Sequence, residues 1–135
     1  MLDCIFCKIV KGDIPSSKLY EDKTTLAFLD IGPVNKGHAL VIPKAHYETI
    51  LDIPDQLLKE VIVTVKKVTD AVKKGVKADG INIGMSNCKD AGQLVFHAHF
   101  HIMPRFKGDG LKLWPQGKYK EKEMEEARVA VKKFL

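Results

Sequence analysis

The chain has 135 residues, which is enough for one hydrophobic core and too few for two domains. Hydrophobic residues make up 45% of it and charged residues 29%, a balance typical of soluble globular proteins. No apolar run approaches the roughly 18 residues that a membrane span requires. The N-terminal residues lack the basic and then apolar layout of a secretory signal. We therefore expect a single domain over residues 1–135, located in the cytoplasm and without a membrane partner.

The net charge of +5 favours anionic ligands but does not indicate a nucleic-acid partner. The basic residues are scattered or lie beside acids, as over residues 118–133, and no nucleic-acid-binding motif or basic stripe accompanies them. The chain has three cysteines, an odd number that argues against a disulfide framework. We therefore expect a small anionic ligand and no nucleic acid.

Turn-forming residues divide the first third of the chain into short elements. Gly, Asp and Pro over residues 11–15 predict a turn, and the apolar run at 25–29 predicts a strand. Two glycines and a proline over residues 31–37 predict a connecting loop. The run at 38–43 is apolar almost throughout, which predicts a central strand.

The clearest helix is expected from Asp52 to about Lys74. Apolar residues recur there at helical spacing while lysines occupy the other side. Valines form helices poorly but suit a helix face that is buried on a sheet. The apolar positions are Leu58, Val61, Val65, Val68 and Val72.

The remaining elements complete a mixed fold. We expect strands at residues 80–87 and 94–103 with a loop at 88–93 between them, then an irregular segment at 106–117 and an amphipathic helix at 119–135. The elements show no repeating strand–helix–strand rhythm. The predicted fold class is therefore α+β, with a mostly antiparallel five-stranded sheet, helices packed on one face and the other face open to a ligand.

Three histidines, His97, His99 and His101, alternate along the strand expected at 94–103. Successive side chains of a strand point to opposite faces, so these rings would share one face and repeat every ~6.6 Å. The opposite face would carry apolar side chains, namely Phe96, Ala98, Phe100 and Ile102.

Such a row of imidazoles indicates a metal site or a reaction surface. A lone histidine is most often a satisfied structural side chain, but burying three without partners carries a desolvation cost and gives no structural return. The two chemical interpretations are metal binding and attack on a phosphoryl or acyl group.

The segment His97-Ala98-His99-Phe100-His101-Ile102-Met103 resembles the His-φ-His-φ-His-φ-φ motif of the histidine-triad (HIT) family, where φ is apolar. Further blocks at 28–31, 37–46, 91–93 and 104–105 are similar to the family's in the same order. The chain departs at Leu94, where some members have a Ser or Thr that can reach a phosphate. The resemblance covers about residues 4–105. It implies a HIT-like fold, nucleotidyl hydrolase or transferase activity on a purine nucleotide derivative, and a homodimer.

The central histidine, His99, is the expected nucleophile. A neutral imidazole, with an ordinary pKa near ~6.5, attacks through one ring nitrogen when an acceptor holds the proton on the other. Backbone carbonyls beside a strand residue can hold that proton, and the family resemblance assigns the same residue. We expect His99 to attack the α-phosphorus of a nucleoside 5′-phosphate derivative. Water then hydrolyses the nucleotidyl-histidine and releases a mononucleotide.

Other expected catalytic groups stabilise the charge on the phosphate. His38 and His101 are candidate donors to its anionic oxygens, and the loop would place Gln93 at the α-phosphate or the bridging oxygen. Gly92 would let backbone approach the phosphate closely. No catalytic metal is required, because imidazoles can supply the charge stabilisation.

The nucleoside would be held by residues near the end of the first predicted strand. Asp30 is expected to accept hydrogen bonds from ribose hydroxyls, with a turn-forming role as the alternative. Phe28 and Ile31 would contact the base. Asn87 would bond sugar or phosphate, and a turn role is an equal alternative.

The spacing Cys4-x-x-Cys7 is half of a zinc site. Position 4 leaves no room for the strand that precedes a redox CxxC motif. His46 and His97 remain once the catalytic histidines are assigned, and family members with this motif resemble that arrangement. A structural Zn²⁺ on these four residues is expected. The alternative is that the cysteines are reduced and unligated while His97 packs beneath the triad.

Two other functions stay open at this point. One is a nucleotide-binding sensor or adaptor with negligible turnover, against which the intact His99 counts. The other is a metalloenzyme with zinc on His97, His99 and His101, against which the lack of an obvious general base counts. In the expected homodimer, Trp114 could reach the site of the partner subunit.

Overall fold

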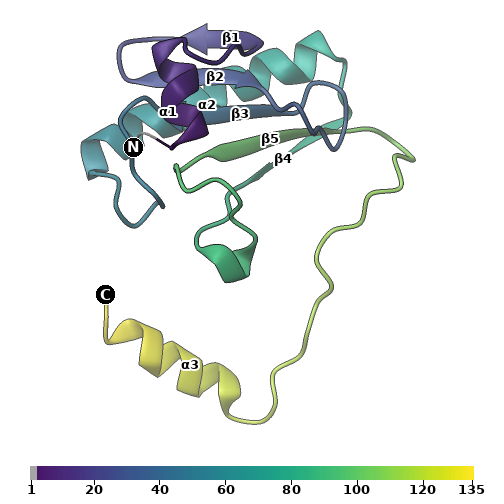
Figure 1. Cartoon of the computed structure of the whole chain (residues 1–135). Coiled ribbons are helices and arrows are strands. Elements are labelled where there is room, and N and C mark those ends of the chain that lie inside the picture. Colours follow the sequence, from purple (N-terminus) through teal and green to yellow (C-terminus); the bar gives the residue numbers. More distant parts are fainter. Residues whose placement is uncertain (1–2) are drawn as a thin grey trace.

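The computed structural model describes residues 3–135 (Figure 1). Its helices and strands follow in chain order, with one short 3₁₀ turn at Lys89–Ala91 between β4 and β5. They are α1 (Ile5–Lys11), β1 (Lys18–Glu21), β2 (Thr25–Leu29), β3 (Ala39–Pro43), α2 (Asp55–Gly75), β4 (Gly80–Gly84), β5 (Phe100–Arg105) and α3 (Glu123–Lys132).

The five strands form one sheet in the order β1-β2-β3-β5-β4, and every neighbouring pair is antiparallel. The predicted fold class is confirmed. At the centre of the sheet β3 pairs with β5, so that Leu40 lies opposite His101. This pairing also brings His38, which directly precedes β3, to the histidine segment.

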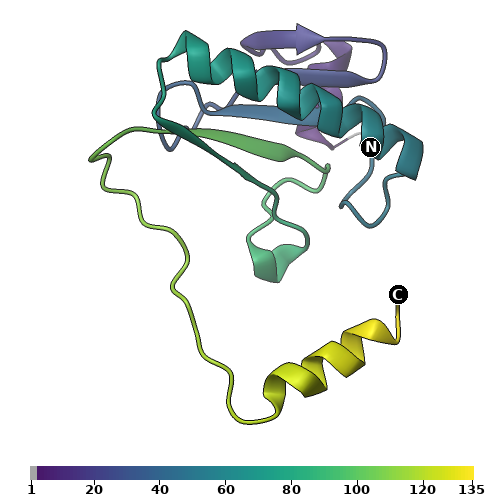
Figure 2. The same ribbon diagram turned by 180° about the vertical axis from the view of Figure 1, so that it is seen from behind.

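Helix α2 covers one face of the sheet (Figure 2). Its valines pack on Ala27, Val41, Phe100 and Ile102, as their helical spacing predicts. The helix begins after Pro54, because a proline is compatible with a helix start. It starts three residues later than the predicted span and ends one residue later, at Gly75. Phe100 and Ile102 thus lie on the face that the alternation of β5 predicts.

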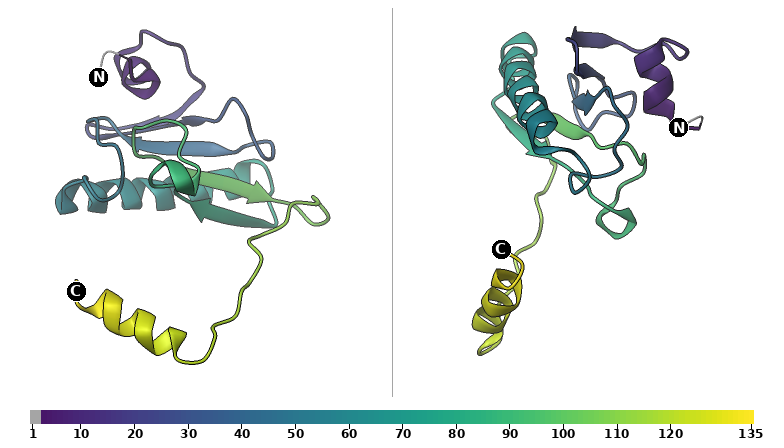
Figure 3. Two further views of the ribbon diagram at one scale, coloured as in Figure 1. Left: turned by 60° about the horizontal axis from the view of Figure 1, so that its bottom comes forward. Right: turned by 90° about the vertical axis from the view of Figure 1, so that its left-hand side faces the viewer.

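Helix α1 lies over the opposite face, so that the sheet is covered on both sides (Figure 3). Cys4 caps it, because the Cys4 Sγ accepts a hydrogen bond from the Cys7 amide, and Gly12 ends it in the left-handed conformation. Phe6 packs there with Phe28 and Leu40. The expectation of helices on one face and an open histidine face therefore needs a correction. Neither α1 nor β1 was predicted, because both are short.

The histidine strand is shorter than predicted and begins at Phe100 instead of residue 94. The chain from 94 to 99 leaves the ladder, because the ring of His97 turns into a cluster with Cys4 and Cys7. Only His101 of the three therefore lies in β5, which continues through Pro104 to Arg105. The three rings nevertheless share the α1 side of the sheet, because Phe6 contacts His97 and His99 edge-on, and the centroids of His99 and His101 lie 5.0 Å apart.

The C-terminal 30 residues extend away from the sheet (Figures 1 and 2). Helix α3 buries none of its residues, and it is shorter than the predicted span of 119–135. Over residues 3–135, no helix combines the length and the apolar character that crossing a bilayer demands.

Candidate active site and metal site

His99 is held in a single tautomer by the backbone that precedes it. Its Nδ1 lies 2.7 Å from the carbonyl oxygen of His97, and a carbonyl can only accept a hydrogen bond. The Nδ1 of the neutral ring therefore carries the proton, and Nε2 keeps its lone pair. This is the state that a nucleophilic imidazole requires.

Burial keeps the His99 ring neutral. His99 is only 7% exposed. The Phe6 ring packs against it edge-on, with the two ring centroids 5.2 Å apart. Burial lowers the pKa of His99, against a smaller opposing effect from its bond to His97 and from Asp30. Phe6 was not predicted as part of the site, because nothing in the sequence indicates that residue 6 returns to the sheet.

His38 and His101 form a directed pair. The amide of Val34 donates to Nδ1 of His38 at 3.1 Å, which leaves the proton of a neutral His38 on Nε2. That Nε2 lies 2.9 Å from Nδ1 of His101 and donates to it. A neutral His101 consequently carries its own proton on Nε2. The bond between the two imidazoles joins the start of β3 to β5.

Asp30 lies beside this pair at the end of β2. One carboxylate oxygen is 3.6 Å from Nε2 of His38 and 3.9 Å from Nδ1 of His101. The other accepts a hydrogen bond from the amide of Gly32. The turn role and a position at the histidine pair thus both belong to Asp30, because each uses a different oxygen.

A cavity of about 350 Å³ opens between α1 and the histidines. Its walls combine apolar side chains with a polar end, which is the usual composition of a small-molecule site. Predicted site residues in its lining are Phe28, Asp30, Ile31, Gly92, His99 and His101, and those not predicted include Phe6, Ile9 and Leu40. His38 does not line it and acts on the cavity through His101.

Two predicted site residues point elsewhere. The side chain of Gln93 is buried and makes three bonds to backbone, donating to the carbonyls of Glu48 and Val95 and accepting from the Cys88 amide. Asn87 accepts from the amide of Ile50. Both side chains fasten the loop that carries Gly92, and neither lines the cavity with His99.

Four residues from three distant segments form a second cluster. The ligand atoms of Cys4, Cys7, His46 and His97 all lie within 4.8 Å of one another. Sγ of Cys4 is 3.4 Å and Sγ of Cys7 is 3.6 Å from Nδ1 of His97, and Sγ of Cys7 is 3.3 Å from Nδ1 of His46. Zinc bonds of roughly 2.3 Å to sulfur and 2.0 Å to nitrogen place tetrahedral ligands about 3.5 Å apart. The spacing therefore fits a tetrahedral zinc ion.

The protonation states also fit a metal. Nε2 of His97 donates to the carbonyl of Pro43 at 2.8 Å, so Nδ1 presents its lone pair to the two sulfurs. Burial raises the pKa of the Cys7 thiol, and the neighbouring Cys4 raises it further. An ion reverses that effect by stabilising the thiolates. The carbonyl of His97 meanwhile holds His99, so one residue belongs to both sites.

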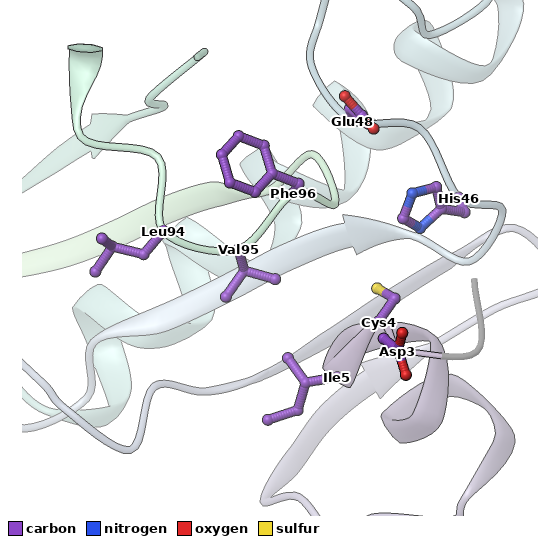
Figure 4. A pocket seen from close by; sticks show the side chains of 8 residues that line it. All are labelled: Asp3, Cys4, Ile5, His46, Glu48, Leu94, Val95 and Phe96. Carbon is purple, nitrogen blue, oxygen red and sulfur yellow. The ribbon is translucent and has the colours of Figure 1, made fainter. Parts of the chain in front are cut away.

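A second cavity, of about 440 Å³, lies beside this cluster (Figure 4). Cys4 and His46 border it, and Leu94, Val95 and Phe96 reach it from the loop before β5. Leu94 is almost fully exposed and lines both cavities. It therefore stands between the two cavities.

A family model described as the HIT domain matches residues 11–108. The chain belongs to the HIT family. It is 48% identical to an adenosine 5′-monophosphoramidase of Schizosaccharomyces pombe over 77% of this chain and 75% of that protein. Because such relatives are named as hydrolases, the expectation that the chain is an enzyme of this family is confirmed.

Solved structures agree with the fold and the cluster. A HIT family member from Bacillus subtilis superimposes with a TM-score of 0.91 at 44% identity, covering 98% of this chain and 97% of that one. A zinc-bound histidine triad protein from Mycobacterium smegmatis gives a TM-score of 0.78 at 36% identity, covering 98% and 96%. The latter and the four-residue cluster together support zinc.

The histidine cluster makes stability depend on pH. Burial, and then the charges of His99 and His38, lower the pKa of His101 to about 4 against a small opposing effect of Asp30. The unfolded ring has a pKa near ~6.5. Between pH 4 and 6.5, the His101 ring is therefore protonated in the unfolded chain and neutral in the folded chain. The free energy of unfolding should consequently fall as pH drops from 6.5 to 4. Urea denaturation of the wild type and His101→Asn at several pH values measures this. The variant should show the shallower slope, and equal slopes would contradict the assignment.

Proposed function

We propose that the chain is a hydrolase that cleaves nucleoside 5′-phosphate derivatives at the α-phosphorus through a nucleotidyl-His99 intermediate. The observation that carries this proposal is the 2.7 Å bond from Nδ1 of His99 to the His97 carbonyl. It leaves Nε2 unprotonated on a ring that lines the cavity. The substrate classes are phosphoramidates, adenylylated amines and dinucleoside polyphosphates, all of which release a mononucleotide.

The reaction has two steps. Nε2 of His99 attacks phosphorus, a bond from Nε2 to phosphorus forms, and the leaving group departs with the electrons of its own bond to phosphorus. Water then attacks the same phosphorus, the bond from Nε2 to phosphorus breaks with its electron pair returning to the ring, and the proton that the water loses balances the one that the leaving group takes up. His101 lines the cavity with its proton on Nε2 and is the nearest imidazole donor for a phosphoryl oxygen. His38 supports His101 in this role instead of touching the phosphate itself.

The nucleoside is proposed to occupy the apolar part of the cavity. Phe28 and Ile31 contact the base there, and Asp30 accepts hydrogen bonds from the ribose. Gly92 has a positive φ of 90° and places backbone near the phosphate, which a side chain would hinder. Gln93 and Asn87 serve by holding this loop in place. Adenosine phosphoramidate is the first substrate to test, because relatives are named for it.

His99→Ala removes the nucleophile and separates an enzyme from a nucleotide sensor. The rate of AMP release from adenosine phosphoramidate should fall by at least about 1,000-fold, because the covalent step is lost. Affinity for AMP, measured by calorimetry, should change little. Asp70→Asn, on the exposed face of α2, serves as a control that retains full activity. Equal rates in the wild type and His99→Ala would leave only the sensor.

The four-residue cluster is proposed to hold one structural Zn²⁺ that fastens α1 to the sheet. Purified protein should contain one equivalent by elemental analysis, and the double variant Cys4→Ser, Cys7→Ser should lose it. Its melting temperature should fall by about 10 °C or more, since structural zinc contributes several kcal/mol to folding. Cys88→Ser, which changes the exposed third cysteine, should keep both the metal and the stability. Zinc retained by the double variant would favour the metalloenzyme with three histidine ligands.

The chain is further proposed to form a homodimer through its C-terminal arm, residues 106–135. Helix α3 has ten residues, which is too short to be stable alone in water, and its Met124 and Val131 are about 60% exposed. Strand β4 is an edge strand whose Ile83 is half exposed. A second copy of the chain would cover both α3 and the edge of β4. The arm would bring Trp114 toward that second copy. Light scattering should give twice the 15.1 kDa of one chain, and a single-chain mass at micromolar concentration would contradict the dimer.

A further inference from the structure

The loop between β2 and β3 carries both Asp30 and His38, yet most of its residues are exposed. It is fixed at its end by Gly37, whose φ of +97° and contact with Val76 leave no room for a side chain. An added Cβ would lie 2.7 Å from a methyl group of Val76. Further back, the loop must hold the amide of Val34 at Nδ1 of His38, because that bond selects the tautomer of the ring. A further contact is therefore needed to fix the loop near Val34.

Asn35 is the residue that reaches out of the loop at this point. Its Nδ2 donates to the carbonyl of Pro104 at 2.9 Å and to the carboxylate of Asp109 at 3.1 Å. Both partners are acceptors, so the side-chain amide has only one orientation that satisfies them. Pro104 belongs to β5, the strand that carries His101. Asn35 thus ties the loop of His38 directly to the strand of its hydrogen-bond partner.

Asp109 is itself held firmly at the base of the C-terminal arm. Its two oxygens accept from Nε and Nη2 of Arg105 at 2.8 and 2.9 Å, and from the amides of Phe106 and Leu111. Arg105 ends β5 and also donates to Asn82 of β4. The acceptor that Asn35 uses is therefore part of a rigid charged network and not a mobile surface side chain.

We propose that Asn35 is a positioning residue for the His38–His101 pair, and that Asp109 holds Asn35 in this role. The two contacts fix the loop against β5, which keeps the Val34 amide on Nδ1 of His38 and the proton of His38 directed at His101. The base of the arm at 105–111 thereby supports the triad, although it contributes no catalytic residue. The effect on turnover rests on the function proposed above, whereas the effect on the tautomers does not.

The two acceptors restrict which side chain can occupy position 35. Aspartate has the shape of asparagine, but it would present a third acceptor to a carbonyl and a carboxylate that both need a donor. Asn35→Asp should therefore be at least as damaging as Asn35→Ala. A residue that merely filled space would be replaced by aspartate without loss.

Long-range ¹⁵N–¹H NMR spectra of the imidazoles at pH 7.5 report the tautomers directly, in the full chain and without substrate. In the wild type, we expect the proton on Nε2 in His38 and His101 and on Nδ1 in His99. In Asn35→Ala and Asn35→Asp, His38 and His101 should become mixtures of tautomers while His99 stays unchanged. Turnover of adenosine phosphoramidate should fall about tenfold in kcat, with KM altered less than about threefold, since the hydrogen bonds of the pair change while the apolar lining of the cavity does not.

Asp79→Ala is the matched control. Asp79 accepts a hydrogen bond from the amide of Lys107 at 2.8 Å, so it fastens the same arm base, but among the hydrogen bonds of residues 3–135 none joins it to the loop. It should leave all three tautomers and kcat as in the wild type. Unchanged tautomers in both Asn35 variants, or the same changes in Asp79→Ala, would overturn the proposal. A wild type without turnover would remove the proposed function, and the tautomers would still decide the role of Asn35.

Discussion

The hydrogen bond from Nδ1 of His99 to the carbonyl of His97 is the interaction on which the site depends. It joins residues only two apart in the chain, in the segment just before β5 begins at Phe100. With that bond in place, the lone pair is on Nε2 of a ring that lines the cavity. A regular strand would have placed three equivalent histidines in a row, whereas the observed segment gives each ring a different partner and so a different role.

His97 connects the cysteine cluster with His99. Its carbonyl accepts the Nδ1 proton of His99, its Nε2 donates to the carbonyl of Pro43 of β3, and its Nδ1 faces the two cysteines. A metal ion at the cluster would therefore hold both α1 and the backbone that orients His99. The same helix supplies Phe6, which covers His99 and contributes to the low dielectric that keeps the ring neutral. His97 therefore links the proposed metal site to the orientation of the His99 ring.

Much of this arrangement could be predicted from the sequence. The alternation of apolar and histidine residues predicts the β5 faces, the valine spacing predicts α2, and the CxxC motif with His46 and His97 predicts the cluster that the structure brings together. Roles that depend on long-range contacts could not be predicted. The return of Phe6 to the sheet and the link from Asn35 to Asp109 join residues far apart in the chain. Gln93 was expected at the phosphate because of its position just before the histidine motif. Its side chain instead bonds to the backbone of Cys88 and Glu48.

The proposed chemistry requires Nε2 of His99 to form a bond to phosphorus during turnover. Rapid acid-free quenching of the reaction with adenosine phosphoramidate, followed by peptide mass spectrometry, measures this directly. We expect an AMP adduct on the peptide that contains residues 97–101, assigned to His99 by fragmentation and appearing no later than the first turnover. An adduct on another residue, or full turnover with no adduct under conditions that preserve phosphohistidine, would contradict it.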